Sequence, residues 1–586
     1  MNYKFKIFTL LFTVTHLVGE DIVLPTHNIS FTGQTFFKKP KLENALGIDH
    51  KSFFEFWKKD SPVIKDKLIP TLKDSISSFY ASQGFYDTKT NIKLTKDNVV
   101  VNIDANKPVK VNKINIQSDY DISSFIKAKT GKTFRAKTFI TSKNDIIEAL
   151  LKDGYCSYDL DTKAYVDLDK HSVDLKYTLK KGGICTFGKL SLFGLKTIDK
   201  KIVISKIRAL EGKRFSTKLV QKTSNSLYNL GAFDSVLINV DRKIYNVIPV
   251  DISFEEIENP YHLEVGAGYD TYEGSRVHGD ITKYNFLGDA QKLNFRASWS
   301  KLEQLSILSY FKPAFLKLSN YGIDFGSSIG YSNLKFDGFK EEKSFVKAYF
   351  LYDNDKTKLK AGIASEVINI NALANLNSNQ YLIRAVNEGN FILFYPYIDF
   401  IYDARDSKLN PKHGYYFATY SEFGISREAG SSSYIKVELE ARAITTFKNL
   451  TLAMVGKIGT LNDKTGTGLP ESKYFFGGGS YSNRAYGFRQ MGVIVSNEKD
   501  TIYGASSMTN LSLEADYPIW GNIYGAVFND NTMLNDKSYS FKGDIISSAG
   551  VGVRYVTPIG PFKLDVAFNT NNPSIYGVSF QIGQSF

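Results

Sequence analysis

The run GSSIG at residues 326–330 is the part of this sequence that most resembles an enzyme's active site. It places Ser328 in the G-x-S-x-G pattern, in which a serine hydroxyl attacks an acyl carbon. That chemistry needs a sharp turn between a strand and a helix, because the turn exposes the hydroxyl. Here the flanking segments alternate apolar and polar residues as strands do, and no helical pattern follows. We therefore expect Ser328 to be an ordinary strand residue and the protein not to be an enzyme.

The two cysteines offer a second kind of chemistry, a disulfide. The residues between Cys156 and Cys185 predict a β-hairpin with strands at 158–168 and 172–179. A hairpin would bring the two sulfurs close, and a disulfide persists in an exported protein; two free thiols are the alternative. The seven histidines are scattered, without metal-ligand spacing. We predict no bound metal and no cofactor.

The elements that position these residues are strands with two different faces. From about residue 261 to the C-terminus, almost every segment alternates apolar and polar residues. Val437 and Leu439 fall on one face of such a segment, and Glu438 and Glu440 fall on the other. This repeated pattern predicts an all-β transmembrane barrel at residues 259–586, with lipid outside and a water-filled lumen. At roughly 20 residues per strand and connection, the barrel has about 16 antiparallel strands, an even number as bacterial barrels have.

The composition agrees with a location in an outer membrane. Aromatic residues make up 14% of the 586 residues, which suits the aromatic girdles of a barrel, although a soluble β protein could share this content. The mean hydropathy of −0.21 suits a barrel in which only alternate residues face lipid. Residues 1–19 resemble a signal peptide, since Lys4 and Lys6 precede an apolar run at 7–18 and Gly19 offers a small residue for cleavage.

Positive charge is concentrated before the predicted barrel. Residues 20–258 hold 39 Lys and Arg against 29 Asp and Glu, a net charge of +10, whereas residues 259–586 hold 32 against 31. The excess would attract anionic lipid headgroups or an acidic partner, and a well-solvated lysine-rich surface is an equal alternative. Nothing in the sequence predicts binding to nucleic acid.

Residues 20–258 carry a pattern that recurs three times, about 75 residues apart. Each copy begins with a short strand, continues with helical segments and ends with two alternating strands, so the unit is β-α-α-β-β. The last helix of each copy stops at Gly84, Gly154 or Gly231, because glycine adopts the left-handed conformation that ends a helix. We predict three α+β domains, at residues 20–108, 109–186 and 187–258.

Three such repeats ahead of a C-terminal barrel resemble the POTRA domains and barrel of the BamA/TamA superfamily of outer-membrane assembly proteins. The repeat count and length are most similar to the TamA branch, because BamA proper usually carries more repeats and two-partner secretion transporters fewer. The resemblance implies a bacterial outer-membrane location with the POTRA domains in the periplasm. It also implies unfolded outer-membrane or autotransporter proteins as clients, and a TamB-like inner-membrane partner.

The run FFGGGSYSNRAYGF at residues 475–488 resembles the superfamily's long extracellular loop that folds back into the barrel. The resemblance implies that its tip consists of Arg484, Ala485 in place of the usual glycine, Tyr486, Gly487 and Phe488. An arginine in a confined lumen needs carboxylate partners to offset its desolvation.

Glu514 and Asp530 are the expected partners of that arginine. The alternation around Glu514 sends Leu511, Leu513 and Tyr517 outward and therefore directs Glu514 inward. Asp530 matches an acidic position of the superfamily, but the direction of its side chain does not follow from the alternation.

Two further runs resemble motifs of the same superfamily. Residues 402–414 resemble its mid-barrel turn, with Asp403, Arg405, Asp406, Pro411 and Gly414 at the matching positions, and the proline and glycine supply the turn geometry. The run at 550–565 resembles the last hairpin of the barrel, after which the chain ends at Phe586.

The barrel must close where its first strand, around 262–269, meets its last strand, around 576–586. Gly266, Gly268 and Gly577 lie in these strands, and glycine weakens strand pairing and packing. We predict that this seam, which ends at Phe586, is short or weak and that it opens to receive client strands.

The resulting prediction is a TamA-like factor that receives clients on its POTRA domains and inserts them through the barrel seam. A BamA-like main insertase and a two-partner-secretion transporter are alternatives within the superfamily. A passive porin or receptor is the alternative of another class, although three periplasmic repeats are costly for a simple pore.

Overall fold

The computed structural model of the chain describes residues 26–48, 62–96, 98–207, 210–240, 246–270, 274–318, 321–335, 339–354, 356–372, 389–428, 432–464, 468–496, 501–557 and 560–582. The predicted signal peptide and Phe586 lie outside these residues. The chain divides into two compact units. One holds the first two repeats with residues 212–218 and 246–248; the other holds the rest of the third repeat and the barrel.

The first repeat is a four-stranded sheet covered by helices. Its strand order is β2-β1-β4-β3, with β1 parallel to β4. The amphipathic helix α2 buries Leu72, Ile76 and Tyr80 against the sheet residues Val99 and Val101. Its elements are β1 (Thr26–Gln34), α1 (Lys39–Ala45), β2 (Val63–Lys65), α2 (Leu72–Ser82), β3 (Lys89–Leu94) and β4 (Asn98–Asp104).

The second repeat has one α-helix rather than two. Its first helical segment is a short 3-10 turn, Ser123–Phe125, because side chains take up backbone donors there: Asp121 accepts from the Ser123 amide at 3.0 Å, and Ser142 accepts from the Lys127 amide at 2.9 Å. The sheet order is β5-β7-β6, with β5 parallel to β7. Its elements are β5 (Lys110–Ser118), α3 (Ala136–Lys152), β6 (Asp159–Asp167) and β7 (Ser172–Lys180).

The third repeat has the full β-α-α-β-β order, in a sheet of order β8-β10-β9. Helix α4 is capped by Asp199, whose carboxylate accepts from the Lys201 amide at 2.8 Å. In the described part of the chain, no helix is long and apolar enough to cross a membrane. The elements are β8 (Thr186–Phe193), α4 (Lys200–Lys206), α5 (Thr217–Tyr228), β9 (Phe233–Val240) and β10 (Val247–Glu256).

A disulfide joins Cys156 and Cys185 where the second repeat gives way to the third. The Cys185 amide donates to the carbonyl of Gly154 at 2.9 Å, and its carbonyl accepts from the amide of Phe215 at 2.8 Å. The Arg214 side chain packs against Gly154, where a Cβ would lie 2.6 Å from its Nε. The disulfide therefore stabilises the contact between the end of α3 and the turn of the third repeat that contains Arg214 and Phe215.

The third repeat also contacts the start of the barrel, within the second compact unit. The Lys206 ammonium at the end of α4 donates to both oxygens of Asp324 in β15, at 2.8 Å each. Asp324 is buried, and it also accepts from the Ala314 amide at 2.7 Å, where the pairing of β14 with β15 is interrupted by a bulge. The bulge thus exposes a backbone donor that helps to hold the carboxylate facing α4.

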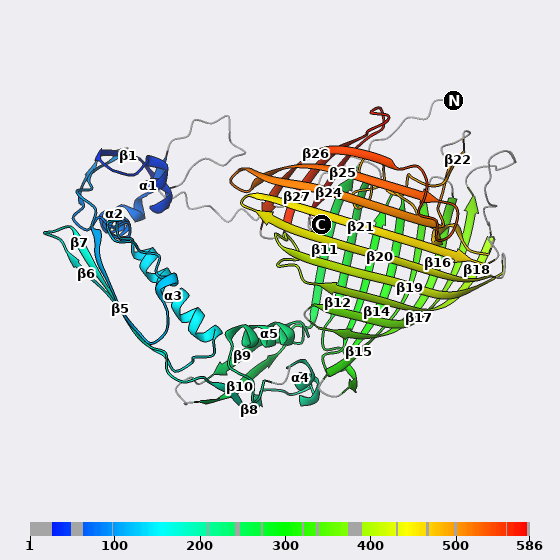
Figure 1. Cartoon of the computed structure of the whole chain (residues 1–586), viewed down its shortest axis with the longest axis horizontal. Coiled ribbons are helices and arrows are strands. Elements are labelled where there is room, and N and C mark those ends of the chain that lie inside the picture. The colour runs from blue at the N-terminus through cyan, green and yellow to red at the C-terminus, as the bar shows by residue number, and fades with distance from the viewer. Residues whose placement is uncertain are drawn as a thin grey trace. The chain divides into compact units, whose positions relative to one another are not determined.

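The barrel is one antiparallel sheet of sixteen strands in which each strand pairs with the next, except that β22 and β23 lie outside it. Figure 1 shows the sheet curling on itself, so that its yellow to red strands pass in front of its green ones. The strands are β11 (Tyr261–Asp270), β12 (Gly274–Lys283), β13 (Lys292–Ser300), β14 (Glu303–Leu318), β15 (Tyr321–Lys335), β16 (Phe339–Asp353), β17 (Thr357–Ala372), β18 (Gly389–Asp403), β19 (Gly414–Glu428), β20 (Ser432–Phe447), β21 (Leu450–Asp463), β24 (Ser507–Trp520), β25 (Ile523–Asn535), β26 (Ile546–Thr557), β27 (Gly560–Asn569) and β28 (Tyr576–Ile582).

The inner face of the barrel is not uniformly wet, contrary to the expectation of a water-filled lumen. In β18, Ile392 and Phe394 are exposed on the outside, whereas Phe391, Leu393 and Tyr395 are buried inside. They belong to an apolar cluster that also includes loop residues. The alternation predicted the outer face correctly, but β18 is apolar on both faces because a loop packs against its inner one.

The two edges of the sheet, β11 and β28, contact each other. Among the described residues no backbone ladder joins these two strands, and the described part of β28 has 7 residues. Gly266 in β11 has a specific reason to lack a side chain, since a Cβ there would lie 2.2 Å from the ring of His278. Gly268 lies in the same strand, paired with Arg276.

We predict that Cys185→Ser lowers the stability of the second repeat by about 2–5 kcal/mol, because the disulfide restricts the unfolded chain. The measurement is urea unfolding of the full chain in detergent micelles, followed by the helical circular-dichroism signal. A reductant should reproduce the loss in the native chain and have no effect on the Cys156→Ser/Cys185→Ser variant. Equal unfolding midpoints for native and variant chains would contradict a stabilising role for the disulfide.

Candidate functional site

A long loop between β21 and β24 folds into the barrel and carries the predicted arginine. It contains a 3-10 turn, Glu471–Lys473, and a hairpin of β22 (Ile494–Ser496) and β23 (Thr501–Tyr503). Gly478 and Gly479 have φ values of +95° and +91°, which L side chains rarely adopt. They allow the loop to turn back on itself, and the Gly479 amide then donates to the Tyr486 carbonyl at 2.9 Å. The segment between Gly479 and Tyr486 places Arg484 against the barrel wall.

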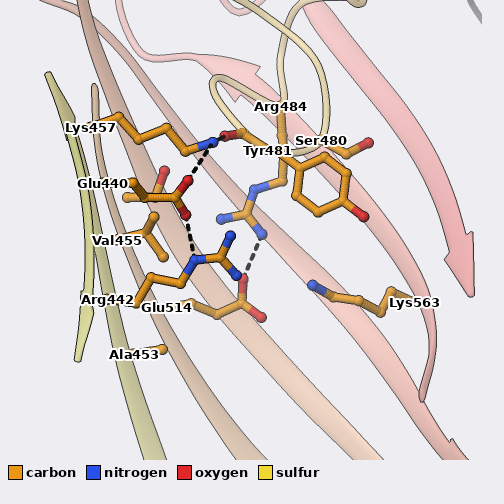
Figure 2. A pocket seen from close by; sticks show the side chains of 11 residues that line it. Glu440, Arg442, Ala453, Val455, Lys457, Ser480, Tyr481, Arg484, Glu514 and Lys563 are labelled. Atoms are coloured by element: carbon orange, nitrogen blue, oxygen red, sulfur yellow. Dashed lines mark hydrogen bonds and ion pairs between the residues drawn. The ribbon is translucent and has the colours of Figure 1, made fainter. Parts of the chain in front are cut away.

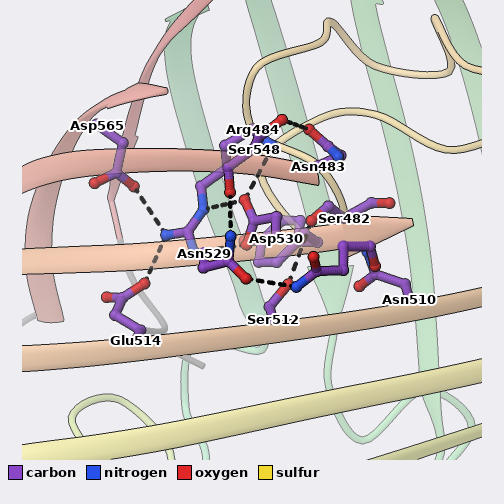
Figure 3. Close-up of polar contacts among 12 residues, drawn as sticks. Ser482, Asn483, Arg484, Asn510, Ser512, Glu514, Asn529, Asp530, Ser548 and Asp565 are labelled. Atoms are coloured by element: carbon purple, nitrogen blue, oxygen red, sulfur yellow. Dashed lines mark hydrogen bonds and ion pairs between the residues drawn. The ribbon is translucent and has the colours of Figure 1, made fainter. Parts of the chain in front are cut away.

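Arg484 is held by the two carboxylates that the sequence predicted. Its Nε and Nη2 donate to the two oxygens of Asp530 at 2.8 and 2.9 Å, and its Nη1 donates to Glu514 at 2.6 Å. The Arg484 amide adds a bond to Asp530 at 3.1 Å. Figure 3 shows this fork between the loop and the strands β24 and β25. All three side chains are buried, so each charge depends on its partners.

Two residues that were not predicted from the sequence, Arg554 and Asp565, extend the network. Arg554 in β26 donates from Nη2 to Glu514 at 2.8 Å and from Nη1 to Asp565 in β27. Asp565 also lies 3.6 Å from Nη1 of Arg484. The sequence did contain a signal for Arg554, because Val553 and Tyr555 are exposed on the outside and the residue between them must point inward. Two guanidinium groups thus share three carboxylates drawn from three strands.

An aromatic ring lies beneath the arginine. The Arg484 guanidinium is centred 3.4 Å from the ring of Phe528, a cation–π contact that desolvation strengthens. Ala485, which replaces the usual glycine of the superfamily motif, is buried against Phe528 and Ala567. Its methyl group therefore fits this site.

The rest of the loop tip is fixed by polar contacts. Asn569 donates from Nδ2 to the Tyr486 hydroxyl at 2.6 Å, and the Gly487 amide donates to Gln490 at 2.9 Å. Phe488 differs from its neighbours, because 56% of it is exposed. Of the predicted motif, Arg484 and Tyr486 thus contact the wall, whereas Phe488 is exposed.

A small cavity of about 40 Å³ borders the arginine (Figure 2). On its rim, Lys457 donates to the Tyr481 carbonyl at 3.0 Å and lies 3.9 Å from Glu440, which also pairs with Arg442. The space suits one or a few water molecules. The residues on its rim join the loop to the barrel wall.

Gly577 connects the last strand to the loop tip. A Cβ at this position would lie 2.3 Å from the carbonyl oxygen of Arg484, so β28 approaches the loop backbone as closely as only glycine permits. We predicted a glycine that weakens the seam, and the structure gives Gly577 a contact of its own. Phe586, the other predicted seam residue of the last strand, lies outside the described residues.

The predicted mid-barrel turn forms a separate structure between β18 and β19. Arg405 donates from Nε and Nη2 to Asp403 at 2.9 Å each. Gly414 has a φ of +121°, and Pro411 is buried beside it in the turn. Burial acts to raise the pKa of Asp406, but backbone amide donors, that of Lys412 among them, outweigh it and lower this pKa below its ordinary value. These five predicted residues shape a hairpin, and the Arg405 guanidinium lies over the ring of Tyr416.

Ser328 lies in the middle of β15, paired with Ser309 on β14 and Lys347 on β16. It therefore occupies a continuous strand rather than the strand-to-helix turn of a nucleophile elbow. Among the residues that the structure describes, no group of three His, Cys, Asp or Glu side chains is placed to hold a metal ion.

We predict that Arg484→Ala destabilises the folded barrel by about 3–5 kcal/mol, because it leaves the buried Asp530 without its guanidinium and Glu514 with one of its two. The measurement is the temperature at which the folded form is lost on semi-native gel electrophoresis. The melting temperature of Arg484→Lys should lie between those of the native chain and Arg484→Ala. Lysine keeps the positive charge but cannot form the two parallel hydrogen bonds of a guanidinium. Arg135→Ala, at an exposed position in the second repeat, is the matched control. A melting temperature equal to that of the control would refute the role of Arg484.

We predict that Gly577→Ala also lowers this temperature, because its Cβ would force apart β28 and the loop backbone. Gly456→Ala in β21 is the matched control, since a Cβ there meets nothing within 4 Å. If both variants melt at the temperature of the native chain, the contact between β28 and the loop does not support the barrel.

Two family models match this chain. Residues 285–586 match the Omp85 superfamily domain, and residues 26–106 and 109–182 match the POTRA family, described as a surface antigen variable number repeat. The outer membrane protein assembly factor BamA of Neisseria meningitidis is 21% identical over 95% of this chain and 78% of that protein. BamA of Buchnera aphidicola is 20% identical over 47% of each chain.

A solved structure shares the fold. BamA from Haemophilus ducreyi lacking POTRA domains 1–3 superposes with a TM-score of 0.53 at 18% identity, covering 81% of this chain and 99% of that one. The family model covers more than half of the chain, and the sixteen-stranded barrel and the preceding repeats agree with it. The chain is a member of the Omp85 superfamily.

Proposed function

We propose that this protein inserts unfolded β-barrel proteins into a bacterial outer membrane, in which its own barrel is embedded. The observation that carries the proposal is the seam, where the two edges of the sixteen-stranded sheet, β11 and β28, contact each other without a backbone ladder among the described residues. A sheet edge presents unpaired backbone donors and acceptors, which cost several kcal/mol each in lipid. A client strand that pairs with such an edge removes that cost. The seam would therefore template client strands without ATP or covalent chemistry.

The repeats offer edges of another kind, in the periplasm. The edge strands β3, β6 and β9 carry the exposed apolar residues Leu94, Tyr165 and Leu237, each more than half exposed. An extended client adds to such an edge by main-chain hydrogen bonds, and its side chains contact the apolar positions. This supports a path in which clients bind the repeats before they reach the seam.

The superfamily offers more than one role of this kind. The curated relatives found are assembly factors named BamA, which supports an insertion role. The three repeats support the narrower proposal of a TamA-like component with a TamB-like partner and autotransporter clients. A BamA-like main insertase and a two-partner-secretion transporter use the same architecture. A passive pore is the weaker proposal, because the loop and its packed cluster occupy part of the lumen.

We predict that the purified protein, reconstituted into liposomes, accelerates the insertion of an unfolded small barrel protein at least several-fold over empty liposomes. Insertion is measured as protection of the client from added protease. Deletion of residues 20–258 should remove the acceleration, because the client then lacks its binding edges. A large steady single-channel conductance without acceleration would instead indicate a pore or a dedicated secretion transporter.

A seam lock is the control for the route. A disulfide between cysteines introduced in β11 and β28 should stop insertion, and a reductant should restore it. Because a reductant also opens the Cys156–Cys185 bond, the native chain is treated in parallel. Insertion that continues through a locked seam would exclude this route.

A further inference from the structure

A buried lysine holds the loop at a second point, far along the wall from Arg484. Lys473 belongs to the 3-10 turn near the start of the loop, and its side chain is 10% exposed. Its Nζ lies 3.0 Å from Glu366 in β17 and 3.1 Å from Glu422 in β19. Both glutamates are buried. One ammonium thus bridges two carboxylates from two different strands.

Aromatic residues complete this second site. The ring of Tyr395 in β18 lies 4.2 Å from Nζ of Lys473, and its hydroxyl donates to Glu366 at 2.6 Å. Tyr420 and Tyr434 donate to the two oxygens of Glu422, at 2.7 and 3.0 Å. Strands β17, β18, β19 and β20 therefore all contribute to the site.

The charges of the site require the lysine. Glu366 has a second cation nearby, since Lys347 lies 3.7 Å from it. For Glu422, no other cation among the described residues is within ion-pair distance. Lys436 lies opposite Glu422 in the pairing of β19 with β20, but its ion pair is with Glu438. A buried carboxylate that loses its ion-pair partner is strongly destabilised. The loop therefore supplies, through Lys473, the positive charge that stabilises the buried Glu366 and Glu422 of the barrel wall.

Apolar packing holds the same segment. Leu469, Tyr474 and Phe475 of the loop are buried in a cluster with inner-wall residues of β16 to β21, such as Phe391 and Leu393. This part of the loop consequently has a large buried contact with the wall, and Lys473 lies within it.

We propose that Lys473 is a positioning residue: it anchors the start of the inward loop to β17 and β19, so that Arg484 at the tip is held against β24, β25 and β27. The two anchored walls are separated in the sheet by β20 and β21. The loop thereby braces one part of the barrel against another. Through the contact of Gly577 with the Arg484 carbonyl, the brace reaches β28 at the seam. The effect on client insertion rests on the proposed function; the position of the loop does not.

The test places a cysteine reporter at the loop tip. Ala485 is 2% exposed, so Ala485→Cys should react slowly with a maleimide, and the native cysteines are already joined in a disulfide. Lys473→Met, which keeps the volume and removes the charge, should raise the labelling rate at least tenfold in detergent-solubilised full chain. Lys464→Met is the matched control, since Lys464 lies in the same loop and is exposed. It should leave the rate unchanged.

A charge-neutral variant separates positioning from simple charge compensation. Lys473→Met/Glu422→Gln removes the lysine together with the carboxylate that has no other ion-pair partner, and it leaves Glu366 beside Lys347; it should regain the heat stability that Lys473→Met loses. If Lys473 positions the loop, the reporter in this variant stays fast to label. If labelling returns to the slow rate, or if Lys473→Met never accelerates it, the proposal is overturned.

The same variants distinguish this proposal from the proposed function. Labelling requires no client, so a native chain that fails to insert clients still reports on the brace. If the native chain does insert clients, Lys473→Met should slow insertion several-fold while Lys464→Met does not. Unchanged insertion alongside fast labelling would show that the loop position has no part in the activity, and this would overturn the proposed link to insertion.

Discussion

The structure depends on the compensation of buried charge inside the barrel. Arg484 and Arg554 share Glu514, Asp530 and Asp565, and none of the five is accessible to bulk water to any large extent. Each carboxylate is expensive to bury alone and becomes tolerable only with a guanidinium in place. Because Arg484 comes from the loop and the carboxylates come from three strands, the loop and the last strands can adopt this packed state only together. Charge pairing thus determines the position of the loop on the barrel wall. Apolar packing alone would determine that position less precisely.

The outer face of the barrel was predictable because lipid imposes a strict period of two. Leu511, Leu513 and Tyr517 are exposed on the outside, and Glu514 is buried inside, as the alternation requires. The repeats were predictable for a similar reason, since Gly84, Gly154 and Gly231 all have positive φ at the ends of their helices. The second repeat departs from the pattern because Asp121 and Ser142 satisfy backbone donors that a first helix would otherwise use. Such side-chain bonds follow no period.

The contents of the lumen were harder to predict, for physical reasons that differ from residue to residue. Asp530 lies between Asn529 and Asn531, so polarity does not alternate there and gives no facing. Arg554 and Asp565 did lie in alternating runs, and counting from Val553 or Leu564 would have placed them inside. Lys473 sits in a 3-10 turn of a loop, where no period exists to count. From the sequence, its partner Glu422 cannot be distinguished from any other polar strand residue, because its special role comes from the contact with the loop.

Glycine links the packed interior to the seam. A strand edge facing lipid is costly. In the described part of the chain, β28 pairs with β27 over Tyr576–Ile582, and no ladder joins its other edge to β11. A strand paired on one side only forms fewer backbone hydrogen bonds than an inner strand and gains stability from a further contact. Gly577 permits that contact, because without a Cβ the strand can lie directly against the Arg484 carbonyl. The same residue that weakens pairing at the edge thus strengthens contact with the interior. The last strand is thus held by its ladder with β27 and by the loop at Gly577, and under the proposed function its other edge, toward β11, is the one that opens to a client strand.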